Sequence, residues 1–328
     1  MRGWAVPYAA AASIGMGLLL ALTPACAFAQ ERAPARDPVQ EPAAELGEVT
    51  VEAQRGLPAT TRFVRSVAPP IGDRGLARWN SPVCVGVLGM EATAAGAMAD
   101  RISDWAFSFG IEIERPGCEP NIIVVATDDA DRTTRELVAS RPRQFRIGVA
   151  GADRGAGALA AFQDDPRPVR WWHVALPMNP DTERPAVRLP GDVATVGGGD
   201  MTRPSDFGPN VLLGFGSRLT RRSRDDLQQA VIVFDVDALD RVDFGQLADF
   251  VSMVALAHID MRGDTSAVPT ILGLFDPGRP QEPTLTEWDR AFLKALYGAE
   301  QTRTNPRANA AEVAELMRRD LDREAERP

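Results

Sequence analysis

The sequence predicts an α/β (or α+β) fold built on a mixed sheet, and three patterns along the chain indicate it. Apolar runs typical of strands alternate with amphipathic helical patterns between about residues 82 and 140. Further strand candidates follow as far as residue 235, and helical patterns dominate the rest of the chain. Strands interleaved with helices are typical of a sheet that has helices packed on it.

Two strand–helix pairs begin the folded part, which we expect to start near Leu76. Residues 82–88 form a strand candidate, and residues 91–109 form a helix candidate whose large apolar side chains recur at helical spacing. Residues 121–126 are continuously apolar, which is typical of a buried central strand. Residues 129–140 predict a second helix, because acidic residues at its start suit the positive end of a helix dipole.

The second half contains three more strand candidates and three more helices. In chain order, the strands are expected at 168–176, 211–215 and 229–235, and the helices at 244–258, 286–297 and 309–326. A loop-rich stretch at 177–209 follows the first of these strands. Thr286 and Asp289 fit a capping box in which Asp replaces the usual Glu or Gln. The last helix has a narrow apolar seam, so it is either docked or loose.

Composition divides the chain into four parts. We expect a signal peptide at residues 1–29, a disordered linker at 30–75, a folded domain at 76–299 and an amphipathic helical tail at 300–328. The linker is rich in Pro, Ala, Glu and Arg and has few large apolar side chains. Such a segment buries too little surface to offset the entropy that folding removes.

The first 29 residues have the three parts of a secretory signal. A basic start is followed by an apolar stretch at about residues 9–22 and by the small-residue sequence Ala27–Ala29. At about 1.5 Å per residue, that stretch reaches about 21 Å and falls short of a ~30 Å hydrocarbon core. We expect cleavage after Ala29 and a periplasmic or secreted mature protein. Lipoprotein processing at Cys26 is the alternative.

Composition also excludes several classes of partner. The net charge of -9 and the pI near 5.0 argue against nucleic acid and anionic lipid. No segment after the leader has about 20 consecutive apolar residues, so we expect no membrane span. Lys294 is the only lysine, which excludes a Walker A nucleotide site. The glycine-rich segments at 197–199 and 214–216 lack the rest of a nucleotide-binding motif.

Removal of the leader leaves two cysteines, Cys84 and Cys118. An even pair in an oxidising compartment predicts a disulfide. Closing a loop of roughly 35 residues stabilises the fold by ~3–4 kcal/mol in the chain-entropy model. Two buried free thiols or a pair of metal ligands are the alternatives, and the lack of a neighbouring histidine disfavours a metal.

One segment of the linker, residues 47–55, alternates apolar and polar side chains at strand spacing. It resembles the TonB box near the mature N-terminus of outer-membrane transporters, which pairs as an added strand with its energising partner. The resemblance implies an accessory role in TonB-linked transport. A stray alternating segment in a linker is the alternative.

The chain has two histidines, His173 and His258, and these are the imidazole bases available to a catalytic triad. It contains no Gly-x-Ser-x-Gly sequence, so we do not expect an α/β-hydrolase. His173 follows two tryptophans in its strand, which favours a packed aromatic wall over a catalytic centre.

The region between residues 243 and 298 carries a family resemblance. Residues 285–298 read L-T-x-x-D-x-x-x-L-x-x-L-Y-G, which resembles the C-terminal helix of matrixin-like metzincins, a group of zincin metallopeptidases. Residues 269–272 lie where that family has a short segment closing beneath the zinc, and residues 246–258 where it has its active-site helix. The resemblance implies a zincin-like mixed sheet with an N-terminal helix, an active-site helix and a C-terminal helix.

Most of the zinc-binding residues of that family are missing. In H-E-x-x-H-x-x-G-x-x-H, three histidines bind zinc and the glutamate polarises the metal-bound water. In this chain, the first ligand position falls on Ala248 and the base on Asp249. The second ligand falls on Ser252 and the third on His258. Alanine has no donor atom and serine is a very poor zinc ligand, so we expect no catalytic zinc and no other cofactor.

The resemblance implies a pseudoenzyme, an exported zincin-like domain that binds an unknown protein or peptide partner. A hydrolase with a site rearranged around His258, Asp249 or His173 is one alternative, and the TonB-linked accessory role is another. The chain also resembles exported bacterial proteins of unassigned function that share the cysteine-bearing strand and the segment Cys118–Asn121.

Overall fold

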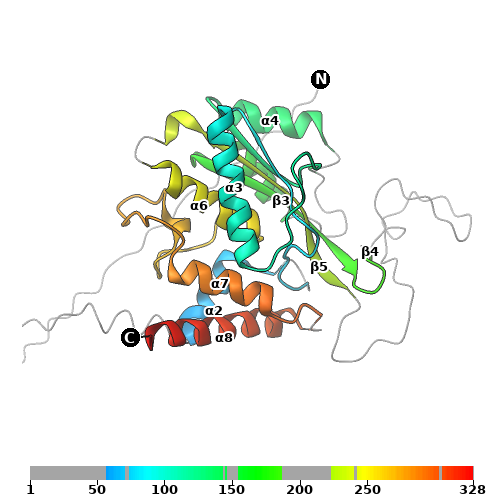
Figure 1. Ribbon diagram of the computed structural model, residues 1–328, viewed down its shortest axis with the longest axis vertical. Helices are drawn as coiled ribbons and strands as arrows, with labels where there is room; N and C mark the ends of the chain where they lie inside the picture. Colours follow the sequence, from blue (N-terminus) through cyan, green and yellow to red (C-terminus); the bar gives the residue numbers. More distant parts are fainter. Residues whose placement is uncertain are drawn as a thin grey trace, which may run out of the picture. The chain divides into compact units, whose positions relative to one another are not determined.

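The computed structural model describes residues 57–70, 74–142, 145, 154–186, 223–239, 242–302 and 305–327 (Figure 1). All of them belong to one structural unit, which spans residues 46–328. The leader, the TonB-box-like segment at 47–55 and the strand candidate at 211–215 lie outside the described residues. Within the described part, no helix is long and apolar enough to cross a bilayer.

A five-stranded mixed sheet lies at the centre of the described chain, in the order β1-β2-β5-β3-β4. Its strands are β1 (Val85–Leu88), β2 (Ile122–Thr127), β3 (Val169–Asn179), β4 (Arg184–Pro185) and β5 (Arg224–Asp235). β1, β2 and β5 run parallel, whereas β3 pairs antiparallel with both β5 and β4. The predicted α/β class with a mixed sheet is confirmed.

Helices cover both faces of this sheet (Figure 1). One face carries α3 (Ala92–Ser108) and α6 (Phe244–Leu256), which pack against each other. The other face carries α4 (Ala130–Ser140) and α5 (Ala156–Asp164), which also contact each other. The short 3-10 helix η2 (Val236–Ala238) follows β5 and leads toward α6.

Two adjacent residues of β3 show how deeply that strand is buried. Trp171 packs edge to face on Phe250 of α6, with ring centroids 5.9 Å apart. Trp172 packs on Phe162 of α5, with ring centroids 6.4 Å apart. Because successive side chains of a strand point to opposite faces, β3 contributes to the core on both sides of the sheet.

The helix α2 (Leu57–Val67) corrects the expected domain boundary, because it folds inside the predicted disordered linker. Its Phe63 contacts the rings of Trp288 and Phe292 in α7 (Glu287–Gly298), with centroids 5.8 Å apart in each pair. The helix has few large apolar side chains, but Phe63, Val64 and Val67 are buried. The folded part therefore begins by residue 57 and not near residue 76.

The helix α8 (Pro306–Ala325) is docked on α2 and α7 (Figure 1). Its apolar seam faces those helices, and Val313, Met317 and Leu321 are buried. The tail predicted from residue 300 onward is therefore part of the folded unit, and the three helices form a layer beside α6.

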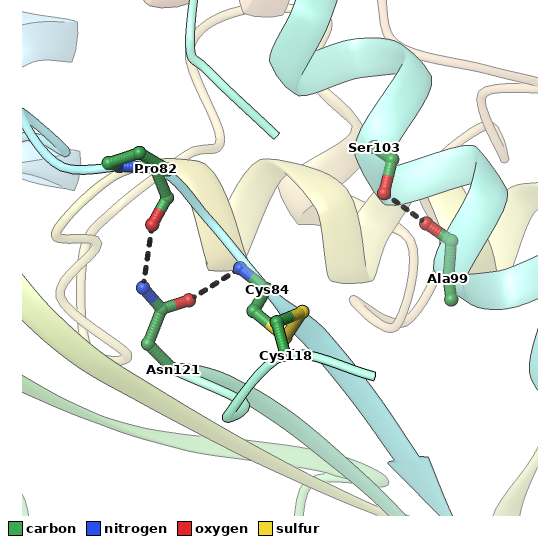
Figure 2. The surroundings of a disulfide bond; sticks show 6 residues. All are labelled: Pro82, Cys84, Ala99, Ser103, Cys118 and Asn121. Carbon is green, nitrogen blue, oxygen red and sulfur yellow. Dashed lines mark hydrogen bonds between the residues drawn. A yellow bond between two sulfur atoms is a disulfide. The ribbon is translucent and has the colours of Figure 1, made fainter. Parts of the chain in front are cut away.

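Cys84 and Cys118 form a disulfide, which confirms the prediction (Figure 2). Their Cα atoms are 6.1 Å apart. The bond joins the chain just before β1 to the loop that leads into β2. Next to it, the Asn121 side chain accepts a hydrogen bond from the backbone N–H of Cys84 and donates one to the carbonyl of Pro82 (Figure 2).

Candidate functional site

The four positions that the sequence resemblance assigns to a zinc site lie on α6 or just after it. Ala248, Asp249 and Ser252 are inside the helix, and His258 comes two residues after its last residue. All four residues are buried. The structure therefore places the predicted positions along one element in the core of the molecule.

A capping box fixes where α6 begins. The Asp243 carboxylate accepts a hydrogen bond from the backbone N–H of Gln246 at 2.9 Å, and the Gln246 side chain accepts one from the backbone N–H of Asp243. Every residue from 246 to 256 is buried. A helix that is buried on all sides is a core element, in contrast to a helix that lines an open cleft.

The Asp249 carboxylate is held by three side chains. Arg101 of α3 donates to both of its oxygens, at 2.6 and 2.8 Å, and the indole N–H of Trp105 donates to Oδ1 at 2.6 Å. The Thr284 hydroxyl donates to Oδ2. Burial acts to raise the pKa of Asp249, but these hydrogen bonds outweigh it and hold the pKa below its ordinary value. Asp249 is a structural anion.

The other two helix positions offer nothing to a metal ion. Ala248 has no donor atom, and the Ser252 hydroxyl donates to the carbonyl of Ala248 at 2.7 Å within the helix. In the part of the chain that the structure describes, no three His, Cys, Asp or Glu side chains are grouped so that they could hold a metal.

The structure brings the two histidines together. The ring centroids of His173, on β3, and His258 are 5.2 Å apart. His173 Nε2 lies 2.8 Å from the carbonyl oxygen of Val254, so Nε2 carries the proton and donates it. Burial lowers the pKa of His173 to about 3 and lowers that of His258 well below its ordinary value. Both rings are therefore neutral at physiological pH.

A larger polar groove, of about 670 Å³, opens at the amino end of β5. Its walls come from the segment before β1, the end of α3, the β3–β4 hairpin and the first residues of β5. Asp226 on its wall accepts hydrogen bonds from Asn80 and Arg224, and Arg78 donates to three carbonyls at the end of α7. The groove thus presents charges of both signs that the protein itself holds in place.

The sequence singled out Asp249 and His173 as candidate residues, but it did not predict the hydrogen-bond partners that decide their roles. Arg101 is 148 residues from Asp249 in the sequence, and His173 is 81 residues from the carbonyl that it contacts. No short pattern joins residues at such separations, so only the fold reveals them. No protein-family model, curated protein or solved structure matches the chain, so its function is inferred from its own residues.

Proposed function

We propose that the chain is an exported zincin-like domain that acts by binding a protein or peptide and does not hydrolyse it. The observation that carries the proposal is the surroundings of Asp249, which occupies the position of the metzincin base. A general base has to reach the proton that it removes. The Asp249 carboxylate is instead occupied by Arg101, Trp105 and Thr284. Since Ala248 occupies the first ligand position, the metal that would activate water also lacks a ligand there.

Contacts of Asp289 support the zincin-like assignment. This residue of α7 accepts hydrogen bonds from the Thr270 hydroxyl and from the backbone N–H of Ile271, which begins the 3-10 helix η3 (Ile271–Gly273). The short segment and the C-terminal helix are the two regions that carry the family resemblance. Both pack against α6, the helix in the place of the active-site helix.

The two alternative functions, a hydrolase with a rearranged site and an accessory protein of TonB-linked transport, have less support. Among the described residues, neither histidine ring is hydrogen-bonded to a carboxylate, so a triad of the usual kind is not assembled. The TonB-box-like segment lies outside the described residues, so no contact bears on it.

Export is supported by the Cys84–Cys118 disulfide, because such bonds persist in oxidising compartments.

We assign the partner to the polar groove at the amino end of β5. Its volume of about 670 Å³ is within the usual size of ligand sites. The mixed charges on its wall suit a polar segment that carries both signs. By contrast, the cavity beside the two histidines is about 20 Å³ and is too small for a peptide side chain.

A peptidase assay tests the non-catalytic part of the proposal. The purified mature chain is supplied with zinc and a mixture of fluorogenic peptides, and the Asp249→Asn variant is measured beside it. We expect neither protein to exceed the rate of a heat-denatured sample. Turnover by the native chain that disappears in Asp249→Asn would show that the carboxylate is a catalytic base and would contradict the proposal.

Site-specific photo-crosslinking in the producing cells tests the groove. A photoreactive residue replaces Gln228, which lines the groove, or Glu136, an exposed residue of α4. We expect one discrete adduct from position 228 and none from position 136. The same adduct from both positions, or from position 136 alone, would place the partner on a different surface.

A further inference from the structure

We propose that the small cavity beside the histidine pair is a binding site for a monatomic anion, with chloride as its occupant. This site is independent of the partner-binding function proposed above. The cavity has a volume of about 20 Å³, which is room for one water-sized particle. Its lining includes Arg154, Trp172, His173, His258 and Arg262.

Two buried N–H groups of residues on its wall have no hydrogen-bond acceptor in the described structure. One is the indole Nε1 of Trp172, a residue that is 3 % exposed. The other is Nε of Arg154, whose terminal nitrogens donate to the carbonyls of Pro69 and His258. A buried donor without an acceptor costs about 1–3 kcal/mol. An anion in the cavity would supply the missing acceptor.

The charge around the cavity is unbalanced. Arg154 and Arg262 both line it, whereas Asp260 is the one carboxylate among the described lining residues. Asp260 lies 3.8 Å from Arg154 and 3.7 Å from Arg262, so a single negative charge faces two positive ones. Burial lowers the pKa of Arg154 to about 10, and Asp260 offsets that only in part.

The start of α5 adds to the positive potential. Gly157 is in the first turn of this helix, and a Cβ atom built on it would lie 3.2 Å from an Arg262 guanidinium nitrogen. The N-cap residue Gly155 has no side chain that could accept the first backbone N–H groups. The positive end of the helix dipole therefore faces the same region as the two arginines.

Size and chemistry together select a monatomic anion. Phosphate, sulfate and the carboxylate of a peptide are all larger than one water molecule. A water molecule fits and accepts two hydrogen bonds, but it leaves the surplus positive charge uncompensated. Chloride is only slightly larger than a water molecule, accepts hydrogen bonds from several N–H donors and neutralises one of the two guanidinium groups.

Thermal unfolding of the mature chain in increasing sodium chloride tests the site, with sodium gluconate added to keep the ionic strength constant. Gluconate is too large for the cavity. We expect Tm to rise by roughly 3–6 °C when chloride exceeds its Kd about tenfold, and to keep rising with the logarithm of the chloride concentration above that. We expect bromide to act like chloride. A flat Tm would mean that the cavity holds water, and an equal rise with acetate would overturn the monatomic assignment.

Two tryptophan variants provide a matched comparison. Trp172→Phe keeps the aromatic ring but removes the unpartnered N–H, and we expect it to weaken chloride binding at least tenfold. Trp79→Phe is the control, because Trp79 is not among the residues that line the cavity and its N–H is already donated to the carbonyl of Ala255 at 2.9 Å. We expect this control to lower Tm but to keep the chloride dependence. Equal chloride dependence in the Trp172→Phe variant and the wild type would contradict the proposal.

If a variant fails to fold, crystals of the unaltered chain grown in bromide give a second test. We expect an anomalous bromine peak within hydrogen-bonding distance of Trp172 Nε1. Anomalous density confined to the protein surface would contradict the assignment.

Discussion

Single residues in this protein take their roles from partners that are distant in the sequence. Asp249 is fully buried, yet it stays charged because Arg101 and two neutral donors surround it. Removing one member of a buried ion pair leaves the other charge without compensation. The Arg101 side chain is 41 % exposed, so water solvates its charge in part when Asp249 is removed. This solvation reduces the loss of stability.

Replacing Asp249 by Asn should destabilise the fold by about 2 kcal/mol, the range expected when hydrogen bonds to a charged group are lost. Urea unfolding measures the change. Asp237→Asn is the control, because Asp237 is an exposed residue of the short helix after β5, and we expect a change within about 0.5 kcal/mol for it. An Asp249→Asn variant as stable as this control would contradict the structural role.

The buried histidine pair predicts a loss of stability in acid. Both residues have folded-state pKa values below the ordinary value of 6.5, and that of His173 is about 3. The two histidines therefore do not reduce the free energy of unfolding above pH 6.5. Below pH 6.5 that free energy declines, because the unfolded chain binds protons that the folded chain excludes. Each histidine contributes a slope of about 1.4 kcal/mol per pH unit.

Unfolding free energies at pH 7, 6 and 5 measure this slope. Replacing both His173 and His258 by Gln should make the dependence shallower between pH 6.5 and 5, even if the variant is less stable at neutral pH. Parallel curves for the two proteins would show that the histidines are not the groups that titrate on unfolding.

At the scale of elements, the disulfide anchors β1 to the loop before β2. The two cysteines are 34 residues apart, and closing a loop of that size should stabilise the fold by about 3–4 kcal/mol. We expect the double variant Cys84→Ser/Cys118→Ser to lose this amount in urea unfolding. The wild-type chain with its disulfide reduced should lose the same amount. A reduced protein as stable as the oxidised one would contradict the prediction.

Phe63 tests whether α2 belongs to the folded unit. Its ring packs between Trp288 and Phe292 of α7, so Phe63→Ala should cost about 3–5 kcal/mol. Arg65→Ala, on the exposed side of the same helix, should change the stability by less than about 0.5 kcal/mol. Similar stabilities of the two variants would mean that α2 is not tightly docked.

The helices that begin with a clear capping residue were the predictable ones. Glu91 and Asp129 accept backbone N–H groups at the starts of α3 and α4, and Thr286 and Asp289 form the predicted capping box. By contrast, α5 was missed because its small residues have no strong apolar period and its N-cap, Gly155, forms no side-chain hydrogen bond. α2 was missed because its polar composition hid a short apolar face.

At the scale of the whole molecule, the mixed sheet was predictable as a class, whereas its pairing was not. The apolar runs indicated strands, but nothing in them required β3 to pair antiparallel with β5, because that pairing joins residues 46 to 65 positions apart in the chain, from Met178 and Arg224 to Val169 and Phe234. The site divides in the same way. The sequence shows that Ala248 and Ser252, two of the proposed ligand positions, carry no good zinc ligand, but the contact between His173 and His258 required the fold.

The most direct test of the central claim, that this domain is non-catalytic, is the zinc content of the purified mature chain. The protein is exposed to excess zinc, desalted and analysed for metal per chain. We predict close to zero, because Ala248 and Ser252 supply no ligand and Asp249 is occupied by Arg101. One tightly held zinc per chain that is lost in a His258→Ala variant would contradict this claim.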